Sequence, residues 1–222
     1  MKKNNIGGSQ PSQATRDWTP IPKEEVNVGK EVTKEILSWV RTIALGVIIG
    51  VLVVVFVVQR DNVYGDSMCN TLQSGDIVFT EKISTYFHNF DRGDVVILDG
   101  HDMEGYDHEE YLIKRIVGLP GETIKIEDGK VYILEVGATE FYELKEDYLD
   151  HDIPWQGGTT VVAHGLMNGY DCVTLGEDEY YCMGDNRPVS NDSRNLGPFS
   201  EDRIKGIAFI RVYPLEKFGL IK

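Results

Sequence analysis

Apolar residues follow one another without a break early in the chain, and alternate with polar residues through most of the remainder. The unbroken run, Thr42–Val58, contains no charged residue. A helix that is apolar on every side is typical of a membrane span, although a buried core helix gives the same pattern. Apolar positions just before Thr42 bring the run to about the length that crosses a bilayer. We therefore predict a transmembrane anchor over residues 36–59.

The residues before the anchor are polar and rich in Gly, Pro, Ser and Asn. A segment of this composition buries too little apolar surface to fold, so we expect a disordered tail over residues 1–35. A short amphipathic helix over Glu31–Val40 would lead into the span.

Basic residues are unevenly placed around the span. Four of them precede it closely, and they are Lys23, Lys30, Lys34 and Arg41. After the span, Arg60 is the only basic residue before Lys82. Because basic flanks stay in the cytoplasm, we expect a single-pass protein with a cytoplasmic N-terminus and its main domain on the outer face of the cell membrane. The segment after Val58 lacks the small residues of a cleavage site, which favours a retained anchor over a removed leader.

Beyond residue 60 the pattern is one of short β-branched or aromatic runs separated by Gly, Asp, Pro or Asn. The runs are Asp76–Lys82, Asp94–Leu98, Tyr111–Val117, Thr123–Ile126, Lys130–Leu134, Gly158–Ala163, Cys172–Leu175, Tyr180–Met183 and Ile207–Val212. Many short strands with almost no helical period indicate a sandwich or barrel-like domain. The predicted fold is mostly β: one transmembrane helix, followed by an all-β domain over residues 60–222.

The formal net charge is −14, and the acidic excess lies after the anchor. Phosphate backbones repel such a domain, so nucleic-acid binding is excluded.

Ser67 lies in the segment GDSMCNTL, residues 65–72, a few residues after the apolar run. A serine among Gly, Asp and Asn is usually a turn residue. A nucleophilic serine requires a base elsewhere in the chain.

Lys114 is the candidate base. In a strand over residues 111–117 it shares a face with Leu112 and Ile116. A lysine there is either exposed at a sheet edge or buried for a purpose, and burial would lower its pKa toward neutrality. Arg115 points to the opposite face and requires a carboxylate partner.

A dense polar segment, YYCMGDNRPVSNDSRNLGPFS, covers residues 180–200. It is either an ordinary surface turn or a closed hydrogen-bonded network that holds a site in place.

Five segments together resemble the successive sequence boxes of the bacterial type I signal peptidases, in their Gram-positive form. They are GDSMCNTL, SGDIV, RGDVVIL, IKRIVGLPGETIKIEDGKVYI and the segment 180–200. The resemblance implies a membrane-anchored Ser/Lys endopeptidase that cleaves signal-peptide-bearing preproteins. It implies no cofactor and no metal, and membrane lipid as the other partner.

By this resemblance Ser67 is the nucleophile and Lys114 the general base. Ser190 would hydrogen-bond and orient the lysine, while Asp192 and Arg194 would form a supporting ion pair. Arg115 would be a structural neighbour of the base, and Met68 would help line the substrate pocket.

Two positions depart from the family pattern. Asn70 replaces the usual proline, which removes no catalytic group. Gly65 stands where Gram-negative members carry a hydroxyl that helps bind the oxyanion, so the backbone N–H of Ser67 must contribute more. The acidic segments 99–110 and 135–152 match nothing in the pattern.

All five histidines lie outside the matched segments, which favours a Ser/Lys pair over a Ser/His/Asp triad. The polar group His101, Asp102, Asp107, His108 and Glu109 fits no metal-ligand spacing, so we interpret it as a solvated loop.

Two other functions remain open at this point. A self-cleaving Ser/Lys repressor would share the fold core, but the membrane span argues against it. A catalytically inactive, membrane-anchored interaction module is the alternative from another class.

Cys172 and Cys182 lie equally far from Glu177, the centre of a predicted turn. A hairpin centred there would place the two thiols opposite each other, where a disulfide could form outside the cell. Two free thiols are the alternative, and Cys69 would be free in either case.

Overall fold

A computed structural model describes residues 28–103, 111–149 and 172–221. Its first element is the helix α1, Val28–Phe56, whose segment Glu31–Val54 is long and apolar enough to cross a membrane. The helix begins at Val28, so the last residues of the predicted tail are helical rather than disordered. An ion pair between Glu31 and Lys34 and a bond from Thr33 Oγ1 to Gly29 O, 2.7 Å long, accompany this early start.

The predicted end of the anchor is also wrong by a few residues. Val58 and Gln59 belong to strand β1, Val58–Asn62, in which Val58 pairs with Glu81. The Val57 carbonyl accepts a hydrogen bond from Lys82 N, 2.8 Å long. Apolar composition continues past the helix because β-branched valines suit a strand as well as a span.

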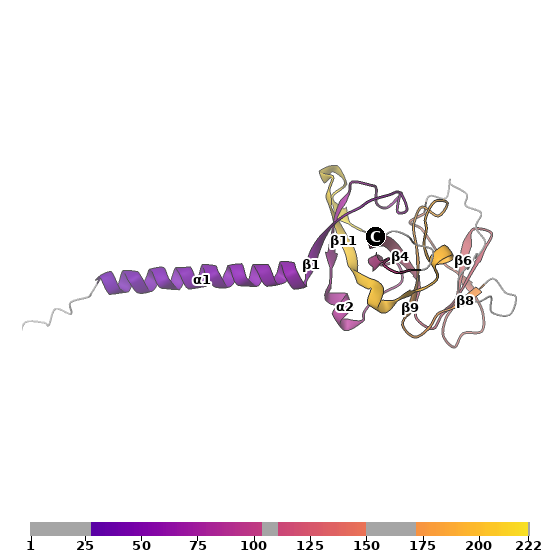
Figure 1. Cartoon of the computed structure of the whole chain (residues 1–222), viewed down its shortest axis with the longest axis horizontal. Helices are drawn as coiled ribbons and strands as arrows, with labels where there is room; N and C mark the ends of the chain where they lie inside the picture. The colour runs from indigo at the N-terminus through magenta and orange to yellow at the C-terminus, as the bar shows by residue number, and fades with distance from the viewer. Residues whose placement is uncertain (1–27, 104–110, 150–171, 222) are drawn as a thin grey trace, which may run out of the picture. The chain divides into compact units, whose positions relative to one another are not determined.

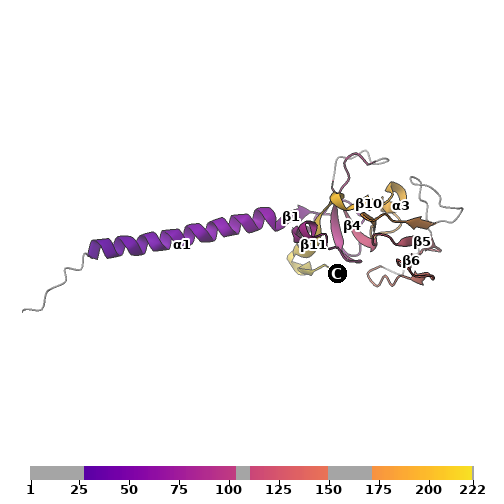
Figure 2. The ribbon, with the colours of Figure 1, turned by 90° about the horizontal axis from the view of Figure 1, so that it is seen from below.

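The larger sheet contains eight strands that pair antiparallel (Figures 1 and 2). Lys114 lies on one of its strands, and Ser67 lies in the connection between two others. Its order begins β1, β2, β11 and β3, where β2 is Ile77–Glu81, β11 is Ile204–Tyr213 and β3 is Val95–Asp99. It continues with β4 (Tyr111–Gly118), β9 (Glu179–Met183) and β10 (Phe199–Ser200), while β12 (Gly219–Leu220) pairs with β11.

A second sheet has four strands, in the order β7, β6, β5, β8. These are Tyr142–Glu143, Lys130–Leu134, Thr123–Glu127 and Cys172–Thr174. Short helical turns complete the domain: α2 (Ile83–Phe87), α3 (Ser193–Leu196), η1 (Glu201–Arg203) and η2 (Leu215–Lys217). The prediction of a mostly β domain after one apolar helix is confirmed, and the predicted strand Gly158–Ala163 lies outside the described residues.

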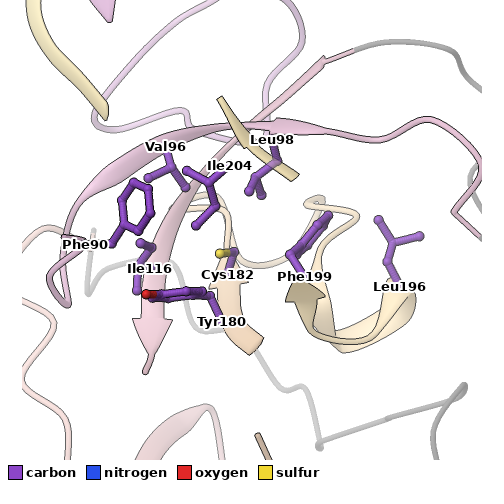
Figure 3. Packing of buried hydrophobic residues seen from close by; sticks show 9 residues of the cluster. All are labelled: Phe90, Val96, Leu98, Ile116, Tyr180, Cys182, Leu196, Phe199 and Ile204. Carbon is purple, nitrogen blue, oxygen red and sulfur yellow. The ribbon is translucent and has the colours of Figure 1, made fainter. Parts of the chain in front are cut away.

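Three clusters of buried side chains make up the core. One of them packs β3, β4 and β9 against α3 and β10, with the rings of Phe90 and Tyr180 edge to face at 5.7 Å (Figure 3). A second fills the smaller sheet, and a third contains Met68, Leu72 and Ile113. This third cluster lies directly beneath the segment that carries Ser67.

The predicted hairpin that would join Cys172 to Cys182 is wrong. Cys172 in β8 pairs with Lys125 of β5, whereas Cys182 in β9 pairs with Ile116 of β4. The turn after β8 therefore carries the chain from one sheet to the other instead of reversing it within one. Cys182 is fully buried in the first cluster, and all three cysteines are free.

Candidate active site

Ser67 lies in a tight turn between β1 and β2. Gly65 takes a positive φ of 77°, which a residue with a side chain rarely adopts. Two backbone hydrogen bonds close the turn, from Cys69 N to Asp66 O at 3.1 Å and from Leu72 N to Met68 O at 2.8 Å. Because Met68 and Leu72 are buried in the core, the nucleophile segment is fixed from below.

Met68, which was predicted to help line the substrate pocket, is buried beside the candidate nucleophile. Its side chain is 1% exposed and packs in the third cluster, underneath the pocket wall.

Lys114 lies on β4, between the neighbouring strands β3 and β9, so the edge-strand alternative is wrong. Its side chain is only 2% exposed. The Lys114 Nζ lies 2.8 Å from Ser67 Oγ and donates a second hydrogen bond to Ile113 O at 3.0 Å. The structure thus brings the two predicted catalytic residues into direct contact.

The surroundings of Lys114 lower its pKa from the ordinary value of 10.5 to about 8. Desolvation by burial is the main cause, since an ammonium loses hydration that the core does not replace. The carboxylate of Asp192 acts in the opposite direction and limits the shift. A substantial fraction of the lysine is therefore neutral near physiological pH, as a base requires.

The predicted ion pair of Asp192 and Arg194 is formed. Arg194 Nε and Nη2 donate to the two oxygens of Asp192 at 2.8 and 2.9 Å, and Gly184 N donates to Asp192 Oδ2 at 2.9 Å. Burial by itself would raise the pKa of Asp192, but these bonds outweigh it and hold the pKa below its usual range. Asp192 is therefore a fixed negative charge at the N-cap of α3.

The predicted hydrogen bond from Ser190 to Lys114 is not formed. The Ser190 hydroxyl is buried and acts on Asp192 instead, because a hydrogen bond from the Ser190 side chain helps to lower the pKa of that carboxylate. It lies against Gly184, where an added Cβ would approach Ser190 Oγ to 2.2 Å. Arg194 Nη2 also donates to Ser190 O at 3.3 Å, so Ser190 lies beside the ion pair of Asp192 and Arg194.

Arg115 has the carboxylate partner that its position in the strand requires. Its Nε and Nη2 donate to Asp185 at 2.9 and 2.7 Å, and both side chains are almost fully buried. Asp185 also accepts a short hydrogen bond from Thr71, in the segment of the nucleophile. The pair joins β4, the segment 65–72 and the polar loop after β9.

Several residues around the site gave no signal in the sequence. Asn186 N donates to Ser67 O at 2.9 Å, and Arg187 is buried in an ion pair with Glu146. The density of polar residues in the segment 180–200 indicated a hydrogen-bonded network. The partners of Asn186 and Arg187 in that network come from segments far away in the chain.

Two cavities meet at the candidate dyad, and Gly65, Ser67 and Lys114 line both. The first, about 720 Å³, has an apolar wall that includes Val78, Ile97 and Ile113. The second, about 630 Å³, is lined by Asp66, Asn186 and Asn191 beside Leu112 and Val189. An extended peptide could therefore pass Ser67 with one part in each cavity.

Within the three described ranges, no three His, Cys, Asp or Glu side chains gather closely enough to hold a metal ion. Part of the acidic loop interpreted above as solvated, residues 104–110, lies outside these ranges.

Comparison with known proteins identifies the family of the chain. Residues 36–213 match the family described as signal peptidase, peptidase S26. Signal peptidase I S of Bacillus subtilis is 33% identical, over 86% of this chain and 95% of its own. Signal peptidase I of Bacillus licheniformis is 31% identical, over 87% of this chain and 96% of its own. A solved signal peptidase I from Enterococcus faecalis is 25% identical with a TM-score of 0.40, covering 54% of this chain and 96% of that one. The chain therefore belongs to the S26 family of signal peptidases.

Proposed function

We propose that the protein is a membrane-anchored serine endopeptidase that cleaves signal peptides from preproteins, with Ser67 as nucleophile and Lys114 as general base. Membership of the signal peptidase family supports cleavage of signal peptides. The single observation that supports the dyad is the 2.8 Å contact between Ser67 Oγ and the buried Nζ of Lys114.

The chemistry follows from these two groups. Neutral Lys114 accepts the hydroxyl proton of Ser67 as its Oγ attacks the scissile carbonyl carbon. The resulting lysine ammonium gives that proton to the leaving amine as the C–N bond breaks, which leaves an ester on Ser67. Lys114 then takes a proton from water, the hydroxide attacks the ester, and the proton returns to Ser67 as the C–O bond breaks.

Negative charge develops on the carbonyl oxygen during each attack. Gly65 offers no side-chain donor, so we assign its stabilisation to the backbone N–H of Ser67. Within the described residues, no hydrogen-bond acceptor occupies this N–H.

The first cavity is suited to the residues that precede the cut. Its apolar wall favours small apolar side chains, in keeping with the Ala-X-Ala pattern that the family resemblance implies. The second cavity would receive residues that follow the cut.

The anchor brings the enzyme to the same surface as its substrates. The basic residues that precede the apolar run Thr42–Val58 favour a cytoplasmic N-terminus with the domain on the outer face. Confinement to one surface raises the effective concentration of a membrane-bound preprotein without any added contact.

Cleavage of a preprotein by the full-length protein in detergent or liposomes tests the proposal. Ser67→Ala and Lys114→Ala should each lower kcat/KM by about a thousandfold or more, because the two residues act together and each substitution removes one of them. Lys130→Ala, which removes an exposed lysine paired with Glu143, is the matched control and should cleave like the wild type. Comparable cleavage by either dyad variant contradicts the mechanism, and an inactive wild type favours the interaction-module alternative.

A further inference from the structure

The acidic region after β6 contains a segment with a defined place in the structure. Residues 144–149, here called the bridging segment, follow the edge strand β7 of the smaller sheet. Leu144 N donates to Val131 O at 2.8 Å and its side chain packs on the core of that sheet. A turn closed by Leu149 N and Glu146 O, 3.0 Å apart, then directs the segment away from the sheet.

Glu146 forms a two-point ion pair with Arg187 of the polar loop. Arg187 Nη1 donates to Glu146 Oε2 at 3.1 Å, and Nη2 bonds the other oxygen. Tyr148 OH donates to Glu146 Oε1 at 2.8 Å. Glu146 and Arg187 are 8% and 3% exposed, so the pair is largely removed from solvent, and loss of one partner would leave the other charge buried without its counter-ion.

Arg187 transmits this contact to the nucleophile through Gly184. Its Nε donates to Gly184 O at 3.1 Å. Gly184 is packed so closely that an added Cβ would lie 2.4 Å from Ser67 O and 2.2 Å from Ser190 Oγ. Asn186 N also bonds Ser67 O, so any movement of this loop changes the position of Ser67.

Tyr148 acts on the other half of the dyad. Its ring lies against the guanidinium of Arg115, with Arg115 Cζ 4.0 Å from the ring centroid. Arg115 directly follows Lys114 on β4 and is held by Asp185. A cation over an aromatic face is favourable when water is excluded, so the ring holds this buried charge in place.

We propose that Glu146 and Tyr148 of the bridging segment are positioning residues for the peptidase reaction, fixing the loop 184–192 and β4 at the separation that the Ser67–Lys114 contact requires. The inference rests on the proposed function and gives the acidic region a role in it. The smaller sheet is then the support on which the active site is aligned.

Loss of the contacts that Glu146 and Tyr148 make with Arg187 and Arg115 has two expected effects. The loop 184–192 carries charged groups that act on Lys114, and its movement would admit water to the amine. The charged and titratable groups that influence Lys114 are Asp192, Cys182, Arg194 and Asp185. Better hydration of Lys114 favours its ammonium, so the acidic limb of the rate profile should move to higher pH.

The test measures kcat, KM and the pH profile of preprotein cleavage by the full-length protein. Glu146→Gln should lower kcat about ten- to a hundredfold with little change in KM, and move the acidic limb upward. Tyr148→Leu should also lower kcat and move the acidic limb upward. Tyr148→Phe keeps the ring over Arg115, so its kcat should fall less than that of Tyr148→Leu. Glu143→Gln is the matched control from the same region, because Glu143 pairs with the exposed Lys130.

A second measurement is independent of turnover. In a Ser67→Ala background, the pH dependence of Lys114 acetylation by acetic anhydride, followed by mass spectrometry of the peptide, reports on the amine directly. Glu146→Gln should shift that dependence to higher pH.

Unchanged kcat per folded molecule and an unchanged acetylation profile in both Glu146→Gln and Tyr148→Leu would overturn the inference. If Glu146→Gln does not fold, the comparison of Tyr148→Leu with Tyr148→Phe decides. An inactive wild type with a shifted acetylation profile would reject the proposed function while retaining the positioning.

Discussion

At the scale of single residues, Lys114 combines a catalytic requirement with a cost in stability. In the proposed mechanism the base is the neutral amine of Lys114, so kcat/KM should rise with pH through about 8 and fall in acid. A rate profile that is flat between about pH 6 and pH 9 would contradict a lysine base with this pKa.

The lowered pKa of Lys114 also affects the free energy of unfolding. Because the pKa of Lys114 is lower in the folded state than in the unfolded state, the unfolded state binds more protons between pH 8 and 10.5. The penalty is therefore complete below about pH 8 and fades as the pH rises to 10.5. Replacing the lysine by an apolar residue of similar volume, Lys114→Met, should stabilise the inactive protein by at most about 3 kcal/mol at pH 7. Urea unfolding of both proteins at pH 7 and pH 10 measures the difference in their free energy of unfolding. If that difference does not shrink at pH 10, the lowered pKa of Lys114 is not its cause.

At the scale of elements, local pattern predicted strands well and strand partners poorly. The alternation of apolar residues located β2 to β6, β8, β9 and β11, and the misplaced charge of Lys114 singled out a lysine that the structure places 2.8 Å from Ser67 Oγ. The partner of a strand depends on contacts far away in the chain, which is why β8 and β9 were wrongly joined in a hairpin. The ion pair of Glu146 and Arg187 was missed for the same reason: neither residue stands out in its own segment.

The strand pairing has a chemical consequence that can be measured. Alkylation of the unfolded protein without reductant should modify all three cysteines, since Cys172 and Cys182 belong to different sheets. Intact mass decides the matter: a single alkylated thiol would restore the disulfide and refute the pairing of β8 with β5.

At the scale of the whole molecule, every cysteine belongs to the domain that follows the anchor. A membrane-impermeant maleimide added to intact cells should therefore label Cys69 and Cys172, which are partly exposed, and spare the buried Cys182. Labelling is best done at mildly alkaline pH, because burial and Asp66 raise the pKa of Cys69. Labelling that appears only after lysis would reverse the proposed orientation, and Cys172→Ser identifies the signal from Cys69.

The meeting of two cavities at Ser67 also bears on how the enzyme could be inhibited. An electrophile that forms a covalent bond to Ser67 Oγ can carry substituents in two directions, an apolar one toward Val78 and Ile97 and a polar one toward Asn186 and Asn191. Each substituent binds its own cavity, and the covalent centre links the two. Binding of one substituent therefore raises the effective concentration of the other at its cavity. Because the nucleophile depends on neutral Lys114, such a compound should react faster at pH 8 than at pH 6, whatever its substituents.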